Sequence, residues 1–482
     1  MIVQTKLPRS KPHGQSISAQ SIHDFIEAIR IQEIEIHSFM MVKNGHVIAE
    51  TTWAPYDSED PHVMNSISKN FTSTAIGMAI DEGRISLDDR VISFFPEEVT
   101  DEIAKNMGNL QVRHLLTMST GHREVPVLSA SSGDNWVKEF LVTPIEQKPG
   151  THFVYNTAAT YMLSAILTKV TGLKLLDYLE PRLFEPLGMT DITTTTCPRG
   201  IHFGGAGMRV KIEDLAKFGL LYLHNGVWEG RQIIPEHWVK EATKKQISSG
   251  NDPNGNWLQG YGYQFWCYKH GIYRGGGAFG QYCIVFAEDN AVVTITAGWM
   301  DMADILDQVW AHLLPGIKGE VALEGNQLKE KVLDVELAAL SYDPPQRRIT
   351  TPNLSKWSHR TLEAEPNDAG IRSFSFEFSK AKNQLIIWNE DGQQNIKIGT
   401  GEWLISECKL KGERLKVAVS GTWNKNNQYE MTVRILGTPF VDVWTCDFIN
   451  HAVRINVLRN IWTMPGLSDM ALISSLTGSF KS

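Results

Sequence analysis

The order of strand-like and helical segments is the feature of this sequence that most constrains its fold. Two β-rich runs surround Asn44-Gly45, a dipeptide typical of tight turns, and predict a hairpin over residues 37–53. A block of helical patterns follows, and strand-like runs return only at residues 257–298. A last amphipathic helix is predicted over 303–314, ended by Pro315-Gly316. Strands that are so far apart along the chain share one sheet only in an α+β domain, which we expect over residues 1–320.

Amphipathic spacing predicts the helices of this first domain. Residues 20–31 carry one apolar face, with Ser21 as the candidate N-cap. A second helical pattern begins at Ser66 and stops at Gly83. Further helices are predicted over residues 114–121, 157–171, 213–225 and 235–243.

The residues after 320 have a different character. Residues 321–349 are expected to form a connector, and residues 350–482 an all-β domain, either a small barrel or a sandwich. Short alternating strands are predicted at 373–378, 384–388, 415–419 and 429–435. Polar clusters at 389–392 and 424–427 are predicted turns.

Charge and cysteine content exclude several classes of protein. Lys and Arg number 46 against 54 Asp and Glu, and this net charge of −8 argues against a nucleic-acid binder, which needs clustered cations. No run approaches the ~20 apolar residues of a membrane span, and the N-terminal residues lack the apolar core of a secretory signal. The five cysteines lack metal-ligand spacing, so we expect reduced thiols, no metal, no cofactor and a cytoplasmic location. No oligomeric state is predicted.

The candidate nucleophile lies in a Ser-x-x-Lys motif formed by Ser66 and Lys69. Because a helical pattern begins at Ser66, the hydroxyl and the amine are i and i+3 neighbours, at a helix end that favours a developing oxyanion. Apolar neighbours would lower the pKa of the Lys69 amine and let it accept a proton. The alternative is a serine N-cap followed by a solvated lysine. The same motif at 379–382 and 406–409 lies in the β-rich region, where this spacing does not align side chains.

Several further segments carry a family pattern, in the same order along the chain: residues 64–97, 112–121, 149–157, 185–190, 204–208, 214–219 and 279–285. Together they strongly resemble the serine β-lactamase and penicillin-binding-protein family, in its class C β-lactamase-like, esterase and D-aminopeptidase branch. The resemblance covers about residues 20–315. It implies an antiparallel sheet flanked by helices with an all-helical subdomain. It also places the nucleophile at Ser66 and its partner base at Lys69.

The second motif of this family is Tyr-x-Asn, and the chain departs from it. Tyr155 matches the tyrosine, but Thr157 stands where the family has asparagine, with Asn156 between them. The resemblance implies that the Tyr155 phenol exchanges protons with Ser66 and the leaving group. Asn156 and Thr157 are candidate substrate contacts, and helix capping is the alternative for both.

The third motif is normally Lys- or His-[Thr/Ser]-Gly, and here it aligns with Gly275-Gly276-Gly277, followed by Ala278. Glycines let a strand approach a ligand closely, so Gly276 and Gly277 are candidate substrate contacts. The Ala278 N–H is the candidate second oxyanion donor beside that of Ser66. The family's cation is missing. By strand alternation Arg274 points to the same side as Gly276 and is a candidate substrate contact, while a flexible hairpin tip is the alternative for the glycines.

The resemblance therefore implies a serine hydrolase that cleaves a small amide, peptide or ester through an acyl-enzyme at Ser66, with Lys69 and Tyr155 as general base and acid. Without a basic residue in the third motif, we expect an amidase, peptidase or esterase, with weak activity on β-lactams. One alternative is a non-hydrolytic, penicillin-recognising sensor that keeps the pocket without turnover. Another possibility is that the β domain itself binds an apolar ligand.

Overall fold

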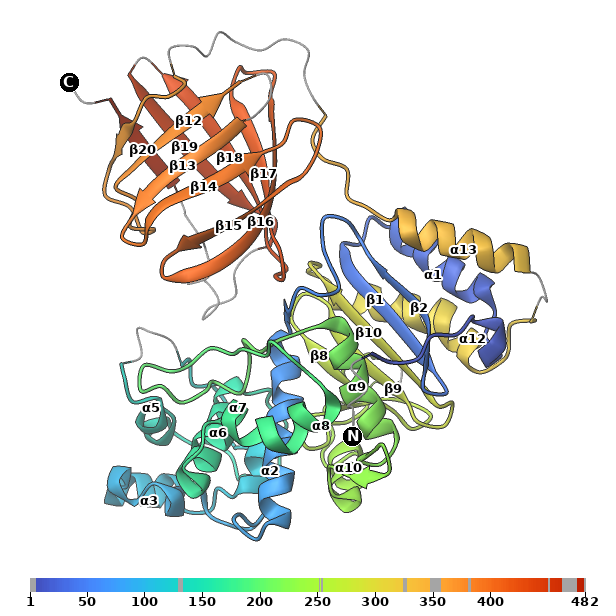
Figure 1. Cartoon of the computed structure of the whole chain (residues 1–482). Coiled ribbons are helices and arrows are strands. Elements are labelled where there is room, and N and C mark those ends of the chain that lie inside the picture. Colours follow the sequence, from blue (N-terminus) through green and yellow to red (C-terminus); the bar gives the residue numbers. More distant parts are fainter. Residues whose placement is uncertain are drawn as a thin grey trace. The chain divides into compact units, whose positions relative to one another are not determined.

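The chain folds into two compact units in the computed structural model (Figure 1). Unit 1 comprises Met1–Thr52 and Pro61–Leu340, and unit 2 comprises Trp53–Asp60 and Ser341–Ser482. The chain therefore enters unit 2 twice. The structure describes residues 6–128, 133–250, 252, 255–323, 327–346, 357–379, 383–449, 451–461 and 475–480.

Unit 1 is built on a six-stranded sheet in the order β2-β1-β10-β9-β8-β7, in which every neighbouring pair is antiparallel. The predicted hairpin is confirmed, because β1 pairs with β2 across a turn in which Asn44 (φ 50°) and Gly45 (φ 76°) are both left-handed. Strands from the two ends of the domain meet where β1 pairs with β10. The strands are β1 (Ile36–Lys43), β2 (His46–Thr52), β7 (Trp266–Cys267), β8 (Ile272–Gly277), β9 (Gln281–Phe286) and β10 (Ala291–Ala297).

Helices cover both faces of this sheet, which explains why all seven residues of β10 are buried (Figure 1). On one face α9 (Ile212–Leu223) packs on β9 and β10, and its Gly219 allows the close approach: a Cβ there would lie 2.6 Å from Val292. The helices that pack together on the other side are α1 (Ala19–Ile31), α11 (Met302–Gln308), the π-helical turn η7 (Val309–Leu313), α12 (Leu314–Ile317) and α13 (Gln327–Ala339).

A block of helices surrounds α2 (Ser68–Asp81), which packs on α6 and α7. Every residue of α2 from Ser68 to Ala79 is buried, so this helix runs through the interior of the block. The short 3-10 helix η2 (Asn65–Ile67) leads directly into it and packs on β8. The remaining elements are η1 (His13–Gln15), β3 (His62–Val63), η3 (Val91–Phe94), η4 (Pro96–Glu98), α3 (Asp101–Met107), α4 (Val112–Leu116), α5 (Trp136–Val142), α6 (Thr157–Thr171), α7 (Leu175–Leu179), η6 (Glu180–Phe184), α8 (Glu185–Leu187), β4 (Arg209–Val210), β5 (Val227–Trp228), β6 (Arg231–Gln232) and α10 (Glu236–Thr243).

Two predicted helix ends differ from the observed ones. Ser18, and not Ser21, caps α1 with its side chain, because the helix begins at Ala19. The helix expected over 114–121 corresponds to the shorter α4. It cannot continue far beyond its last residue, because Met118 has a left-handed backbone (φ 55°).

The closing helix of unit 1 also differs from its prediction. It was expected to end at Pro315-Gly316, but α11, η7 and α12 run on to Ile317. Pro315 is tolerated because it lies at the start of α12, directly after the π-helical turn, where its missing N–H breaks no regular helix bond.

Unit 2 is all-β, as predicted, and barrel-like. Ten strands follow the order β14-β13-β12-β11-β20-β19-β18-β17-β16-β15, and β14 and β15 also lie close to each other. Ring contacts join Phe376, Phe378, Trp423 and Phe448, of which Phe376 and Trp423 are buried. The strands are β11 (Leu362–Ala364), β12 (Ser373–Phe378), β13 (Asn383–Asn389), β14 (Gly392–Ile398), β15 (Leu404–Leu410), β16 (Glu413–Trp423), β17 (Tyr429–Ile435), β18 (Val441–Ile449), β19 (Ala452–Arg459) and β20 (Ser475–Ser479).

The domain boundaries predicted at residues 320 and 350 do not coincide with those of the units. Much of the expected connector is α13, which packs on α1 and belongs to unit 1. The rest of it lies in unit 2, where Tyr342 donates its N–H to the Ala54 carbonyl (2.8 Å). Residues 324–326 and 347–349 of the connector, and 380–382 of the second Ser-x-x-Lys match, lie outside the described residues.

Two further findings bear on the predicted class of protein. Among the described helices, none combines the length and the apolar character that crossing a membrane requires. All five cysteines carry free thiols, and all except Cys267 are buried.

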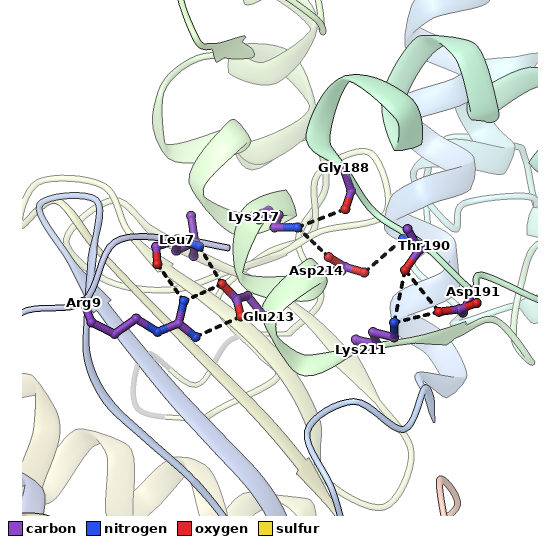
Figure 2. Close-up of polar contacts among 9 residues, drawn as sticks. All are labelled: Leu7, Arg9, Gly188, Thr190, Asp191, Lys211, Glu213, Asp214 and Lys217. Atoms are coloured by element: carbon purple, nitrogen blue, oxygen red, sulfur yellow. Dashed lines mark hydrogen bonds and ion pairs between the residues drawn. The ribbon is translucent and has the colours of Figure 1, made fainter. Parts of the chain in front are cut away.

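Polar side chains of α9, the helix that packs on β9 and β10, bind the end of the helical block (Figure 2). Lys217 and Asp214, one turn apart, form an ion pair of 2.8 Å, and their residues are only 1% and 5% exposed. Lys217 also donates to the Gly188 carbonyl (3.2 Å), and Asp214 accepts the Thr190 N–H (3.3 Å). The pair therefore holds the end of the helical block on α9.

The same helix holds the N-terminal segment. Glu213 accepts the Leu7 N–H (2.6 Å) and pairs with Arg9 (2.7 Å), as Figure 2 shows. Arg9 pairs in turn with Glu50 on β2 (2.8 Å). The first described residues are thus tied to both α9 and the edge of the sheet.

The buried ion pair predicts a clear difference between two aspartate variants. Asp214→Ala leaves the Lys217 cation buried without its counter-ion and should lower the stability of unit 1 by about 3–5 kcal/mol. Asp191→Ala removes the exposed partner of Lys211 and should cost less than about 1 kcal/mol. Calorimetric melting of both variants checks this, and equal effects would contradict it.

Candidate active site

Ser66 lies in η2, at the point where the chain turns into the buried helix α2. The preceding residue, Asn65, has a left-handed backbone (φ 45°), a conformation that asparagine tolerates better than most residues. Its carbonyl accepts the Ser68 hydroxyl (2.6 Å), and Ser68 in turn accepts the Met208 N–H (3.1 Å). These bonds fix the turn, and Ser66 remains partly exposed at the start of a helix, where the backbone dipoles favour negative charge.

Lys69 is 1% exposed, so the solvated-lysine alternative is excluded. Its Nζ donates to Ser66 Oγ (2.9 Å) and to the Gly205 carbonyl (2.6 Å). Both partners are neutral oxygens, and burial lowers the pKa of the Lys69 amine from 10.5 to about 7. The amine is therefore close to half deprotonated at neutral pH and lies in contact with the hydroxyl.

Tyr155 brings a phenol to the same point from the segment before α6. It hydrogen-bonds Ser66, which favours the phenolate, but burial outweighs this and raises the pKa of the phenol. The ring stacks on Trp266, with centroids 5.6 Å apart, and Lys69 Nζ lies 4.9 Å from its centroid. The hydroxyl, amine and phenol predicted from distant motifs thus converge, and the phenol is neutral and able to donate a proton.

Asn156 is not available to a substrate, which corrects its prediction as a substrate contact. Its side chain is fully buried and caps α6 by accepting the Ala159 N–H (3.1 Å). Thr157, the first residue of α6, is partly exposed and lies beside Gly205: a Cβ on Gly205 would be 2.7 Å from the Thr157 methyl group. The second partner of Lys69 is thus a backbone carbonyl, whose close approach requires glycine at position 205.

The glycine run is a buried strand and not a flexible tip. All six residues of β8 are buried, and Gly276 and Gly277 pair with β9. A Cβ on Gly277 would lie 2.2 Å from the Met64 carbonyl oxygen and 3.2 Å from the Ser66 nitrogen. A Cβ on Gly275 would lie 2.4 Å from the Asn70 amide oxygen. These two glycines let β8 lie directly against the turn that carries the nucleophile.

Ala278 follows β8 at the same edge and is partly exposed. Its carbonyl accepts Asn65 Nδ2 (2.8 Å) and Gln281 Nε2 (3.2 Å). Asn65 therefore ties the end of β8 to the residue before the nucleophile. This arrangement is compatible with the predicted oxyanion donors, the N–H groups of Ser66 and Ala278, which remain a prediction.

Arg274 points to the same side of β8 as Gly276, as alternation predicted. The ring of Trp257 faces both residues: it is 4.4 Å from the guanidinium and 3.4 Å from a Cβ placed on Gly276. However, Arg274 is fully buried and donates to the Asn256 carbonyl (2.5 Å). Its prediction as a direct substrate contact is therefore corrected, because the side chain has no exposed surface.

Three parts of the site were missed in the sequence. Gly205 lies in a segment that matched the family pattern, but nothing local indicates that its carbonyl meets Lys69. Asn65 stands next to the nucleophile, and its left-handed backbone carries no sequence signal beyond the residue type. Trp257 and Trp266 were not among the predicted site residues, yet Trp257 is only partly buried and Trp266, a buried core residue, stacks on Tyr155.

Comparisons with known proteins show which proteins this chain is similar to. The family model described as Beta-lactamase matches residues 32–308, more than half of the chain. A 6-aminohexanoate-dimer hydrolase of Paenarthrobacter ureafaciens is 27% identical over 297 residues, which cover 56% of this chain and 75% of that protein. Among solved structures, EstCE1, a hydrolase with promiscuous acyltransferase activity, aligns with a TM-score of 0.51 at 17% identity, over 62% of this chain and 99% of its own.

The alignment with a third similar protein covers more of this chain than unit 1 contains. The structure of SurE with D-Leu aligns with a TM-score of 0.50 at 15% identity, over 87% of this chain and 96% of its own. That share of the chain is larger than unit 1 alone. At this level of identity the two structural likenesses establish the fold.

Gly276 and Gly277 lie on opposite faces of β8, so we expect substitutions at these two positions to differ strongly in their effect on activity. Gly277→Ala should lower kcat/KM on a p-nitrophenyl ester by about 100-fold, because its Cβ displaces the turn that carries Ser66. Gly276→Ala should change it by less than about threefold, because its Cβ makes only ordinary contact with Trp257. Circular dichroism confirms that both variants are folded, and an inactive Gly276→Ala beside an active Gly277→Ala would refute the packing described.

Proposed function

The chain belongs to the beta-lactamase family and is a serine hydrolase, and on this basis we propose that it cleaves a small amide or ester through an acyl-enzyme on Ser66. The observation that carries the proposal is the buried Lys69 amine, held between Ser66 Oγ and the Gly205 carbonyl. An amine of pKa about 7 is half deprotonated at pH 7, whereas at the ordinary 10.5 only about one in 3,000 is. Lys69 is therefore a base at the pH at which such an enzyme works.

In the proposed acylation step, Lys69 Nζ accepts the Ser66 proton while Oγ attacks the carbonyl carbon of the substrate. The N–H groups of Ser66 and Ala278 hold the oxygen that becomes negative, and the start of α2 adds its dipole. Tyr155 donates its proton to the leaving amine or alcohol and regains one from the Lys69 ammonium. The C–N or C–O bond then breaks and leaves the acyl group on Ser66.

Deacylation uses the same groups in the opposite direction. Water loses a proton to the neutral Lys69 amine, either directly or through Tyr155, and attacks the acyl carbon. Ser66 Oγ leaves and takes up a proton, which restores the starting state. Lys69 and Tyr155 each hydrogen-bond Ser66, and Lys69 Nζ lies 4.9 Å from the centroid of the Tyr155 ring.

The substrate class is inferred from the family and from the third motif. The relative from Paenarthrobacter ureafaciens bears the name of a hydrolase of 6-aminohexanoate dimers, which supports a small linear amide. No cation of β8 is exposed beside Ser66 to hold the carboxylate of a β-lactam, because Arg274 is fully buried. We therefore favour linear amides and short esters over β-lactams.

Labelling with a fluorophosphonate tests the assignment of the nucleophile. Wild-type chain should gain one probe mass per molecule, and Ser66→Ala should gain none and lose hydrolysis of amides and p-nitrophenyl esters. Ser406→Ala is the matched control, because Ser406 and Lys409 repeat the motif on β15 of unit 2; it should label like wild type. Full labelling of Ser66→Ala would end the proposal, and one burst of product without turnover would favour the sensor.

The pH profile tests the role of Lys69. Because the amine is the base only when deprotonated, kcat/KM should rise about tenfold per pH unit below an apparent pKa of about 7 and level off above it. Lys69→Arg, which cannot deprotonate near neutral pH, should show no such rise and little activity. A flat wild-type profile from pH 5 to 9 would contradict the assignment.

A further inference from the structure

Three aromatic side chains form a continuous row that starts at the nucleophile; we call Tyr155, Trp266 and Trp257 the aromatic row. Tyr155 bonds Ser66 and stacks on Trp266, and Trp266 meets the ring of Trp257 edge-on, with centroids 5.0 Å apart. Trp257 is partly exposed and lies against β8 at Gly276, where an added Cβ would be 3.4 Å from its ring. A large flat side chain therefore covers the buried strand whose end adjoins Ser66.

Arg274 holds Trp257 in place. The guanidinium stacks on the indole at 4.4 Å and donates to the carbonyl of Asn256, the residue before it (2.5 Å). Asn256 is itself fixed by its side chain, which accepts Trp310 Nε1 (2.7 Å) and donates to Asp307 (2.9 Å). Backbone and ring at 256–257 are thus anchored from two directions.

The burial of Arg274 is costly and needs a reason. It is fully buried, and among the described residues neither its Nε nor its Nη1 has a hydrogen-bond partner. A buried guanidinium without a carboxylate is a poor source of stability. Its hydrogen bond and its closer ring contact both lead to the segment 256–257, and its second ring contact, 5.9 Å from Trp266, lies within the same aromatic row, so its effect is to position Trp257.

We propose that Trp257 is a specificity-determining residue and Arg274 its positioning residue. Trp257 forms the partly exposed end of the aromatic row that starts at Ser66, and there it limits the width of the group on the scissile carbonyl, so that the site accepts slender, unbranched chains and rejects branched or fused-ring groups. This inference rests on the proposed function and deepens it, because it names the shape of the substrate. It also gives a steric reason, independent of the missing cation, why a fused bicyclic lactam is a poor substrate.

The test compares two p-nitrophenyl esters, the slender butyrate and the branched pivalate. Trp257→Ala should raise the ratio of kcat/KM for pivalate over butyrate by about tenfold or more, mainly through a lower KM for pivalate. Trp257→Phe, which keeps a ring against β8, should stay close to the wild-type ratio. An unchanged ratio in an active Trp257→Ala enzyme would overturn the inference.

The positioning role is tested by Arg274→Met, which keeps the apolar stem and removes the charge. It should shift the ratio in the same direction as Trp257→Ala but by less, and Arg274→Lys should lie between it and wild type. A second pair of substrates, the mono-p-nitrophenyl ester of glutaric acid and its methyl ester, tests the competing role. If Arg274→Met selectively loses the carboxylate substrate and keeps the size ratio, Arg274 binds an anion and the inference fails.

Two controls separate this inference from other effects. Trp403→Ala removes another indole near an arginine, Arg434 in unit 2, and should leave the pivalate ratio unchanged; an equal shift would count against a role specific to Trp257. Ser66→Ala should abolish turnover of all four esters. If Ser66→Ala stays active, the proposed function fails; if only the Trp257→Ala ratio stays flat, the proposed function stands and the inference falls.

Discussion

A lysine amine buried without a carboxylate is the interaction on which the rest of the site depends. Lys69 and Lys217 are equally buried, at 1% exposure, yet their surroundings differ in one respect. Lys217 is paired with Asp214 and serves as a structural cation, whereas Lys69 donates to the neutral oxygens of Ser66 and Gly205 and faces the ring of Tyr155. A carboxylate beside Lys69 would raise its pKa and remove the base. The ability of Lys69 to act as a base thus follows from the lack, among the described residues, of a carboxylate partner in its surroundings.

Close backbone approach supplies the geometry around that amine. Gly205 brings its carbonyl to Lys69 past the methyl group of Thr157, and Gly277 brings β8 against the Ser66 turn. In both places a single Cβ would occupy space already held by neighbouring atoms. Asn65 then ties the end of β8 to the same turn through the Ala278 carbonyl. Four segments that are distant along unit 1 therefore meet here, because glycines allow their backbones to approach closely and a few hydrogen bonds hold them together.

The sequence predicted those features that local pattern determines. The hairpin at Asn44-Gly45, helix α6 over 157–171 and the four strands predicted in unit 2, which correspond to β12, β13, β16 and β17, all follow from spacing and turn residues, and the structure confirms them. Helical spacing predicted that Lys69 lies beside Ser66, but the approach of Tyr155 to this pair was predictable only through family resemblance, because its separation along the chain carries no geometric information. The predictions that Asn156 and Arg274 contact substrate were wrong, and the reason is physical. Residue type and strand alternation indicate which way a side chain points, but not whether it is buried.

The boundary of unit 2 is another feature that local sequence pattern does not predict. Trp53–Asp60 lies within residues 1–320, the predicted first domain, but belongs to unit 2. There Tyr56 lies against Arg434, and Asp60 pairs with Lys416 (2.7 Å). These partners are more than 350 residues away, so no local pattern reveals them. Since the chain leaves unit 2 at Asp60, six residues before Ser66, a single cut at residue 340 does not separate the units. It would strip the partners from the segment that precedes the nucleophile.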